Sequence, residues 1–147
     1  MKVRELMRHP VRTVAPGDSL ADAAALMAQR DVGILPVVED DRLVGIVTDR
    51  DIAIRGVANR LRCGVRVDRV MSRKVLSCGP DDDLDAVLET MASQQLRRLP
   101  VCANGELVGM ISIGDAAQTE EYQEAAALTL SNVSRPHGRH SRHRPAA

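Results

Sequence analysis

The chain contains two copies of one sequence pattern. Residues 43–51, Leu-Val-Gly-Ile-Val-Thr-Asp-Arg-Asp, recur as residues 107–115, Leu-Val-Gly-Met-Ile-Ser-Ile-Gly-Asp, at an offset of 64. The same offset aligns residues 3–51 with residues 67–115 without a gap, and 15 of these 49 pairs are identical. A register that holds over this length predicts two copies of one structural unit.

Each copy has a length at which a domain by itself is only marginally stable. A unit of about 60 residues buries only about 60% of the surface that its unfolded chain exposes. In a chain of 147 residues, we therefore expect the two copies to fold together. We predict a first repeat over residues 1–56, a connector over 57–64, and a second repeat over 65–131 that ends in a long helix. Residues 132–147 are rich in Pro, Gly, Arg and His, which predicts a disordered basic tail.

Both repeats show the same order of predicted elements: strand, helix, strand, strand, helix. The expected elements of the first repeat are an extended piece at 13–15, a helix with an apolar stripe from Leu20 to Met27, strands at 34–38 and 43–47, and a helix that Gly56 ends. Those of the second are an extended piece at 75–77, a stripe from Leu84 to Met91, strands at 98–102 and 107–111, and a helix from about residue 112 to about residue 130. The Asn104-Gly105 pair predicts a two-residue hairpin turn. This is an α+β pattern in duplicate, with pseudo-two-fold symmetry expected between the β-α-β-β-α units.

Composition argues against several classes of function. Phe and Trp are absent and Tyr122 is the only aromatic residue, so the chain lacks a base-stacking platform and nucleic-acid binding is not expected. No apolar stretch approaches the length of a membrane span. Three cysteines without a C-x-x-C motif fit reduced thiols, and we expect a cytoplasmic protein. No nucleophile with an activating base, metal-ligand cluster or Walker loop is evident, so we do not expect an enzyme.

Two motifs, present in both repeats, carry a resemblance. Leu-Pro-Val stands at 35–37 and again at 99–101, and each copy is followed by Gly-x-x-Thr/Ser-x-x-Asp, at 45–51 and 109–115. One such motif would be a weak signal, but two in matched context are strong. With these motifs the sequence resembles the cystathionine-β-synthase (CBS) domain family, in its paired form called a Bateman module. The resemblance covers nearly everything except the tail.

The resemblance implies a regulatory or sensor module that binds an adenosine nucleotide such as AMP, ADP or ATP in a cleft between the two repeats. A module of this kind is expected to require no cofactor, to form a homodimer, and to signal to a protein target by a conformational or dimer change. The ribose hydroxyls are expected at Asp51 and Asp115, since a carboxylate accepts two hydrogen bonds. Thr48 and Ser112 are expected to contact phosphate.

The resemblance also implies phosphate contacts from basic residues just before the Leu-Pro-Val strand. The second repeat has Arg97 and Arg98 there, whereas the first has Gly33 and Ile34. Only one strong set of phosphate ligands exists, which argues against a second triphosphate site. The two arginines could serve the Asp51 site, the Asp115 site or both.

Simpler interpretations stay open for these residues. Asp51 and Asp115 could be first-turn acids that favour a helix start, with Thr48 and Ser112 as ordinary caps. Arg97 and Arg98 could lie on a solvated strand edge. At the level of the whole protein, the alternatives are a dimeric interaction scaffold without a ligand and a polyanion binder. The second would act through the four arginines and three histidines that follow Ser134.

Overall fold

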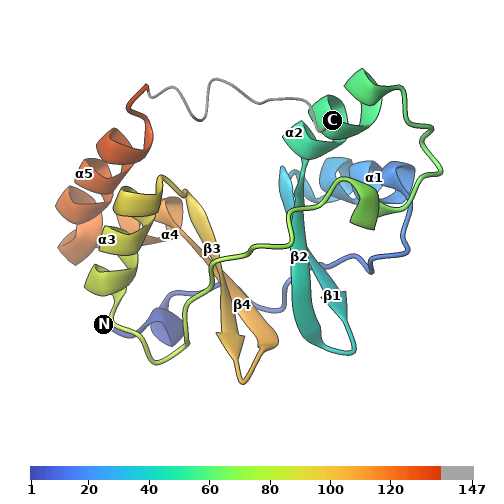
Figure 1. Ribbon diagram of the computed structural model, residues 1–147. Coiled ribbons are helices and arrows are strands. Elements are labelled where there is room, and N and C mark those ends of the chain that lie inside the picture. Colours follow the sequence, from blue (N-terminus) through green and yellow to red (C-terminus); the bar gives the residue numbers. More distant parts are fainter. Residues whose placement is uncertain (137–147) are drawn as a thin grey trace. The chain divides into compact units, whose positions relative to one another are not determined.

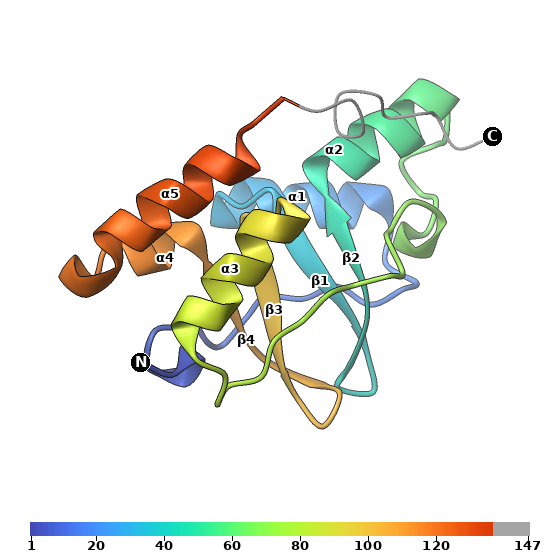
Figure 2. The same ribbon diagram turned by 60° about the vertical axis from the view of Figure 1, so that its left-hand side comes forward.

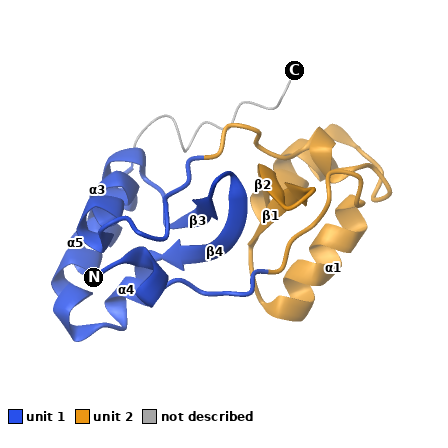
Figure 3. Ribbon diagram, turned by 90° about the horizontal axis from the view of Figure 1, so that it is seen from below, with its two compact units in different colours: residues 1–11, 76–137 blue, residues 12–75, 138–147 orange. Residues whose placement is uncertain are grey.

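The computed structural model describes residues 1–136 and divides them into two compact units (Figure 3). Unit 1 contains residues 1–11 and 76–136, and unit 2 contains residues 12–75. The boundaries of the two units differ from those of the predicted repeats, 1–56 and 65–131. The reason is that the turn that opens each repeat packs onto the hairpin of the other repeat. No helix in the described residues is long and apolar enough to cross a membrane.

Unit 2 is built from one hairpin and the helices around it (Figure 1). Its elements are α1 (Leu20–Arg30), β1 (Ile34–Glu39), β2 (Arg42–Thr48), α2 (Asp49–Asp51), a π-helix (Ile52–Gly56) and two 3₁₀ turns (Val57–Asn59 and Val67–Arg69). The strands pair antiparallel, with a bulge between Val37 and Val38. Asp40 and Asp41 have φ of 50° and 64°, and these positive values close the turn between β1 and β2.

Unit 1 repeats this plan and adds a helix (Figure 2). Its elements are a 3₁₀ turn (Val3–Glu5), α3 (Leu84–Gln94), β3 (Arg98–Ala103), β4 (Glu106–Ser112), α4 (Ile113–Ala117), a 3₁₀ turn (Glu120–Tyr122) and α5 (Gln123–Val133). The hairpin again has a bulge, between Val101 and Cys102. Asn104 and Gly105 take φ of 53° and 80°, so the predicted turn is confirmed. The predicted α+β class is confirmed as well.

The long helix predicted from about residue 112 to about residue 130 is wrong in one respect. The chain leaves helical geometry at Thr119, where φ is −100° and ψ is 119°. This bend buries Tyr122 in the core of unit 1, where its hydroxyl donates to Oδ2 of Asp85 at 3.2 Å. As a result α5 packs against α3 and α4 instead of continuing α4 (Figure 2).

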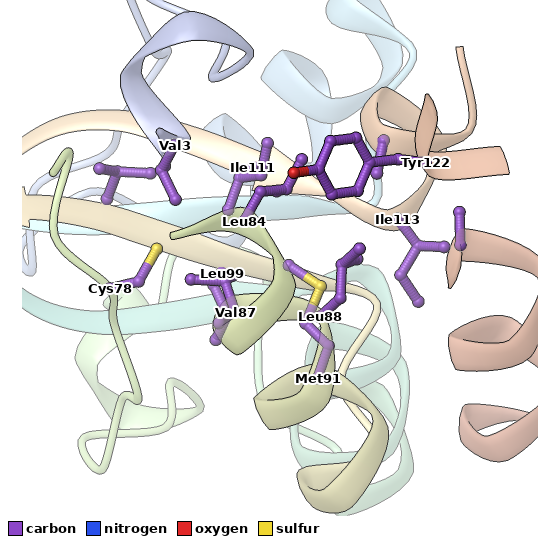
Figure 4. Close-up of a cluster of buried hydrophobic side chains, with 13 residues drawn as sticks. Val3, Cys78, Leu84, Val87, Leu88, Met91, Leu99, Ile111, Ile113 and Tyr122 are labelled. Carbon is purple, nitrogen blue, oxygen red and sulfur yellow. The ribbon is translucent and has the colours of Figure 1, made fainter. Parts of the chain in front are cut away.

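Each unit has its own hydrophobic core. The core of unit 1 contains Val3, Leu84, Met91 and Leu99, all at most 1% exposed (Figure 4). The residues at equivalent positions in unit 2 also lie in one core: Val67, Leu20, Met27 and Leu35. Val3 belongs to the first repeat by sequence but packs with residues of the second, and Val67 does the reverse. The apolar stripes predicted on both helices are therefore the faces that the helices bury.

Candidate functional site

Thr48 and Asp51 lie together where β2 passes into α2. Oγ1 of Thr48 accepts a hydrogen bond from the Asp51 backbone N–H at 3.0 Å, and Oδ2 of Asp51 accepts one from the Thr48 N–H at 3.0 Å. This reciprocal pair is a capping box, which the Thr-x-x-Asp spacing favours because N-cap and N3 face each other. Asp51 is nevertheless only 8% exposed, which is unusual for a carboxylate.

Ser112 and Asp115 form the same arrangement where β4 passes into α4. Oγ of Ser112 accepts from the Asp115 N–H at 3.1 Å, and Oδ2 of Asp115 accepts from the Ser112 N–H at 2.9 Å. The Ser112 hydroxyl also donates to the same Oδ2 at 2.6 Å. Asp115 is 6% exposed. The repeat thus places two buried carboxylates in equivalent local geometry.

Capping occupies only one oxygen of each carboxylate. Oδ1 of Asp51 lies 3.7 Å from Nε of Arg55, a separation longer than a hydrogen bond. Oδ1 of Asp115 accepts a hydrogen bond from Nε of Arg8 at 2.6 Å. The interpretation as first-turn acids therefore accounts for Oδ2 and leaves the second buried oxygen to other partners.

Arg97 and Arg98 lie in the same unit as Ser112 and Asp115. The carbonyl of Arg97 accepts from the Ile113 N–H at 3.0 Å, and Arg98 is the strand partner of Ser112. Both arginines are exposed, and Nη2 of Arg97 donates to Oγ of Ser134 at 3.5 Å. Four of the predicted residues thus meet at the end of β4. Thr48 and Asp51 meet at the end of β2.

Two further arginines at these sites were not predicted from the sequence. Arg55 stands four residues after Asp51, and that helical spacing of opposite charges could have identified it. Arg8 is 107 residues from Asp115 in sequence, and no local pattern links them. It reaches Asp115 because the turn that opens the first repeat packs onto the hairpin of the second.

A cavity of about 340 Å³ also lies in unit 1, between the segment 77–83 and α3. Its lining includes Asp81, Asp82 and Asp83. Asp81 and Asp83 form ion pairs with Arg4 and Lys2. The acidic wall disfavours a phosphate group there, so the cavity is not a candidate for a nucleotide's phosphates. The described residues contain no group of three or more His, Cys, Asp or Glu side chains suited to a metal ion.

Comparison with known proteins gives consistent matches along the chain. The CBS domain family model matches residues 3–56 and 67–120. The CBS domain-containing protein YhcV of Bacillus subtilis is 39% identical over 132 residues, which cover 90% of this chain and 94% of that protein.

Two solved structures with similar folds hold adenosine compounds. The CBS domain protein PAE2072 from Pyrobaculum aerophilum, complexed with AMP, matches with a TM-score of 0.76 and 25% identity over 87% of this chain and 99% of that one. The CBS domain pair of protein MJ0100, in complex with 5′-methylthioadenosine and S-adenosyl-L-methionine, matches with a TM-score of 0.72 and 25% identity. This match covers 80% of this chain and 94% of that one.

Proposed function

Because this chain belongs to the CBS domain family, we propose that it is a regulatory module that binds an adenosine nucleotide and is not an enzyme. AMP, 5′-methylthioadenosine and S-adenosyl-L-methionine are the compounds held by the two similar structures. They share adenine joined to a ribose that presents two adjacent hydroxyls. The proposed ligand of this chain is therefore AMP, ADP, ATP or a close relative.

The observation that carries the proposal is the pair of buried carboxylates at equivalent positions. Asp51 and Asp115 are 8% and 6% exposed, and the local capping contacts use only Oδ2 of each. A ribose diol can donate two hydrogen bonds to one carboxylate. Hydrogen bonds to a charged group contribute about 1.5 to 3 kcal/mol, so this contact is a large part of the affinity of a small ligand.

The phosphate contacts proposed for this ligand come from Thr48, Ser112, Arg97 and Arg98. Arg97 and Arg98 are exposed on unit 1, and a guanidinium can hold a phosphate through two parallel hydrogen bonds. Unit 2 has Gly33 and Ile34 at the equivalent positions. Arg97→Ala with Arg98→Ala should therefore weaken ATP more than adenosine, which has no phosphate.

Regulation by this module requires that the ligand favours one of two states. Occupancy shifts such an equilibrium only by the difference in affinity between the states. We propose a cytoplasmic homodimer whose packing, or whose affinity for a protein target, depends on nucleotide. Light scattering with and without AMP measures the first of these effects. Capture of cell proteins on immobilised protein, with and without AMP, measures the second.

The decisive experiment is calorimetric titration of AMP, with 2′-deoxy-AMP as the matched ligand control. We expect AMP to bind, 2′-deoxy-AMP to bind more weakly, and Asp51→Asn with Asp115→Asn to remove the difference between them. Saturating AMP should also raise the melting temperature, because a ligand at 100 times its Kd adds about 2.7 kcal/mol. Absence of binding by AMP, ADP and ATP would favour the ligand-free scaffold.

The polyanion-binding alternative rests on a tail that lies almost entirely outside the described residues. A truncated chain that ends at Val133 distinguishes the polyanion-binding alternative from the nucleotide-binding proposal. If the tail carries the function, this truncation abolishes salt-sensitive binding to RNA or DNA and leaves AMP binding unchanged.

A further inference from the structure

We propose that Arg8 is a built-in competitor of ribose at Asp115, so that the Asp51 site takes nucleotide first. This inference rests on the proposed function. It concerns regulation of the same site, because it makes the two equivalent carboxylates unequal in how readily they bind ribose. The inference follows from the hydrogen-bond and ion-pair partners of each carboxylate within its own unit.

Asp115 already has a hydrogen-bond donor on each oxygen. Oδ2 accepts from the Ser112 N–H at 2.9 Å and from its hydroxyl at 2.6 Å, while Oδ1 accepts from Nε of Arg8 at 2.6 Å. The Arg8 contact joins two full charges, and such hydrogen bonds are short and strong. Both lone pairs of Oδ2 are thus in use, so a ribose diol that donates two hydrogen bonds to Asp115 needs both lone pairs of Oδ1 and must displace Arg8.

The backbone of Arg8 is fixed while its guanidinium is accessible. The Arg8 N–H donates to the Met110 carbonyl at 2.8 Å, and the Met110 N–H donates to the Arg8 carbonyl at 3.0 Å. The Arg8 side chain is 71% exposed, compared with 7% for Asp115. Arg8 can thus leave the carboxylate by side-chain rotation, without any change in the backbone pairing.

The equivalent position in the other repeat is Ser72, and its backbone is held in the same way. The Ser72 N–H donates to the Ile46 carbonyl at 2.8 Å, and the Ile46 N–H donates to the Ser72 carbonyl at 2.9 Å. A serine side chain carries no guanidinium. Within the described residues, the cation paired with Asp51 is Arg55, whose Nε lies 3.7 Å from Oδ1.

The two sites therefore start from different states. At Asp51 a ribose diol meets an Oδ1 atom to which no side chain among residues 1–136 donates a short hydrogen bond, whereas at Asp115 it must first break a charged one. This predicts sequential filling, with Asp51 occupied at lower AMP concentration. The basis is one residue difference at matched positions, Arg8 against Ser72.

The test isolates the Asp115 site in the full chain by Asp51→Asn and then adds Arg8→Ser, which copies the residue of the other repeat. AMP and adenosine are titrated by calorimetry, and adenosine separates effects on ribose from effects on phosphate. We expect Arg8→Ser to tighten both ligands about ten- to hundredfold, the equivalent of one charged hydrogen bond. The reciprocal Ser72→Arg, in an Asp115→Asn background, should weaken the Asp51 site.

Arg12→Ser is the matched control, because it removes an exposed arginine of unit 2. Thermal unfolding of each variant shows whether it is folded. If Arg8→Ser does not fold, Arg8→Lys, which keeps the positive charge, takes its place. Binding that Arg8→Ser leaves unchanged, or changes no more than Arg12→Ser does, would overturn the competition while the proposed function stands. No binding of AMP or adenosine to the wild type or to any variant would overturn both.

Discussion

Gly45 lies directly against Met71: a Cβ atom on Gly45 would stand 2.7 Å from Sδ of Met71 and 2.9 Å from the Ser72 carbonyl oxygen. Gly109 has the same relationship to Met7, with a Cβ at 2.7 Å from Sδ and 3.1 Å from the Arg8 carbonyl oxygen. The glycine of each Leu-Val-Gly motif therefore makes room for the turn that opens the other repeat. This close approach also allows the backbone hydrogen bonds that hold Arg8 and Ser72 at their hairpins.

Replacement of either glycine by alanine should destabilise the protein. Overpacking of a well-packed site costs about 1 to 3 kcal/mol, and Gly45→Ala should cost more than Gly109→Ala. The reason is that the Ser72 carbonyl is backbone and closer, whereas a methionine side chain can move. Urea unfolding measures both free energies. Gly64→Ala is the control, because apart from the two chain neighbours no heavy atom of the described residues lies within 4 Å of a Cβ placed there. Equal stability of Gly45→Ala and Gly64→Ala would contradict the packing.

Much of the fold follows from local sequence signals. The Asn104-Gly105 pair has positive φ at both positions, and the strand expected at 98–102 is β3, Arg98–Ala103. These features depend on the residue types at neighbouring positions, which a sequence displays directly. The Thr-x-x-Asp spacing likewise predicts the capping box at Thr48.

The exchange of opening turns could not be predicted in this way. Val3 and Val67 are identical at matched positions, so sequence does not say which hairpin each one packs against. The Arg8 contact to Asp115 depends on that exchange and was missed with it. The bend at Thr119 was missed because residues 113–130 favour helix by propensity, while burial of Tyr122 requires the turn. The phosphate roles of Arg97 and Arg98 stay predictions.

Leucine substitutions should separate the core of unit 1 from its surface. Leu84 is fully buried, whereas Leu128 on α5 is 65% exposed. Leu84→Ala should lower the free energy of unfolding by about 2 to 5 kcal/mol, because it leaves a cavity. Leu128→Ala makes the same chemical change and should shift it by less than about 0.5 kcal/mol. Similar losses for both in urea unfolding would show that Leu128 is covered in solution.

The three cysteines should differ in reactivity toward iodoacetamide. Cys63 is exposed, whereas burial raises the pKa of the Cys78 thiol to about 11 and also raises the pKa of Cys102. Because the thiolate is the reactive form, native protein at about pH 8 should be modified first at Cys63 and at Cys78 only after unfolding. Peptide mass spectrometry over time measures this order. Cys63→Ser should remove the fast phase, and rapid labelling of Cys78 in that variant would contradict its burial.

Stability should fall in acid partly through Asp68, whose Oδ2 accepts from Nη2 of Arg66 at 2.8 Å. This hydrogen bond holds the pKa of Asp68 below its ordinary value of 3.8. A carboxylate whose pKa is lowered by folding stabilises the protein above its unfolded pKa, and this contribution disappears as pH falls through the folded pKa. Asp68→Asn should therefore reduce stability slightly at pH values above 3.8 and make the loss below that value less steep. Urea midpoints from about pH 7 to about pH 2 measure both effects. Glu89→Gln, which removes an exposed carboxylate on α3, is the control, and an unchanged acid slope in Asp68→Asn would contradict the role of the pair.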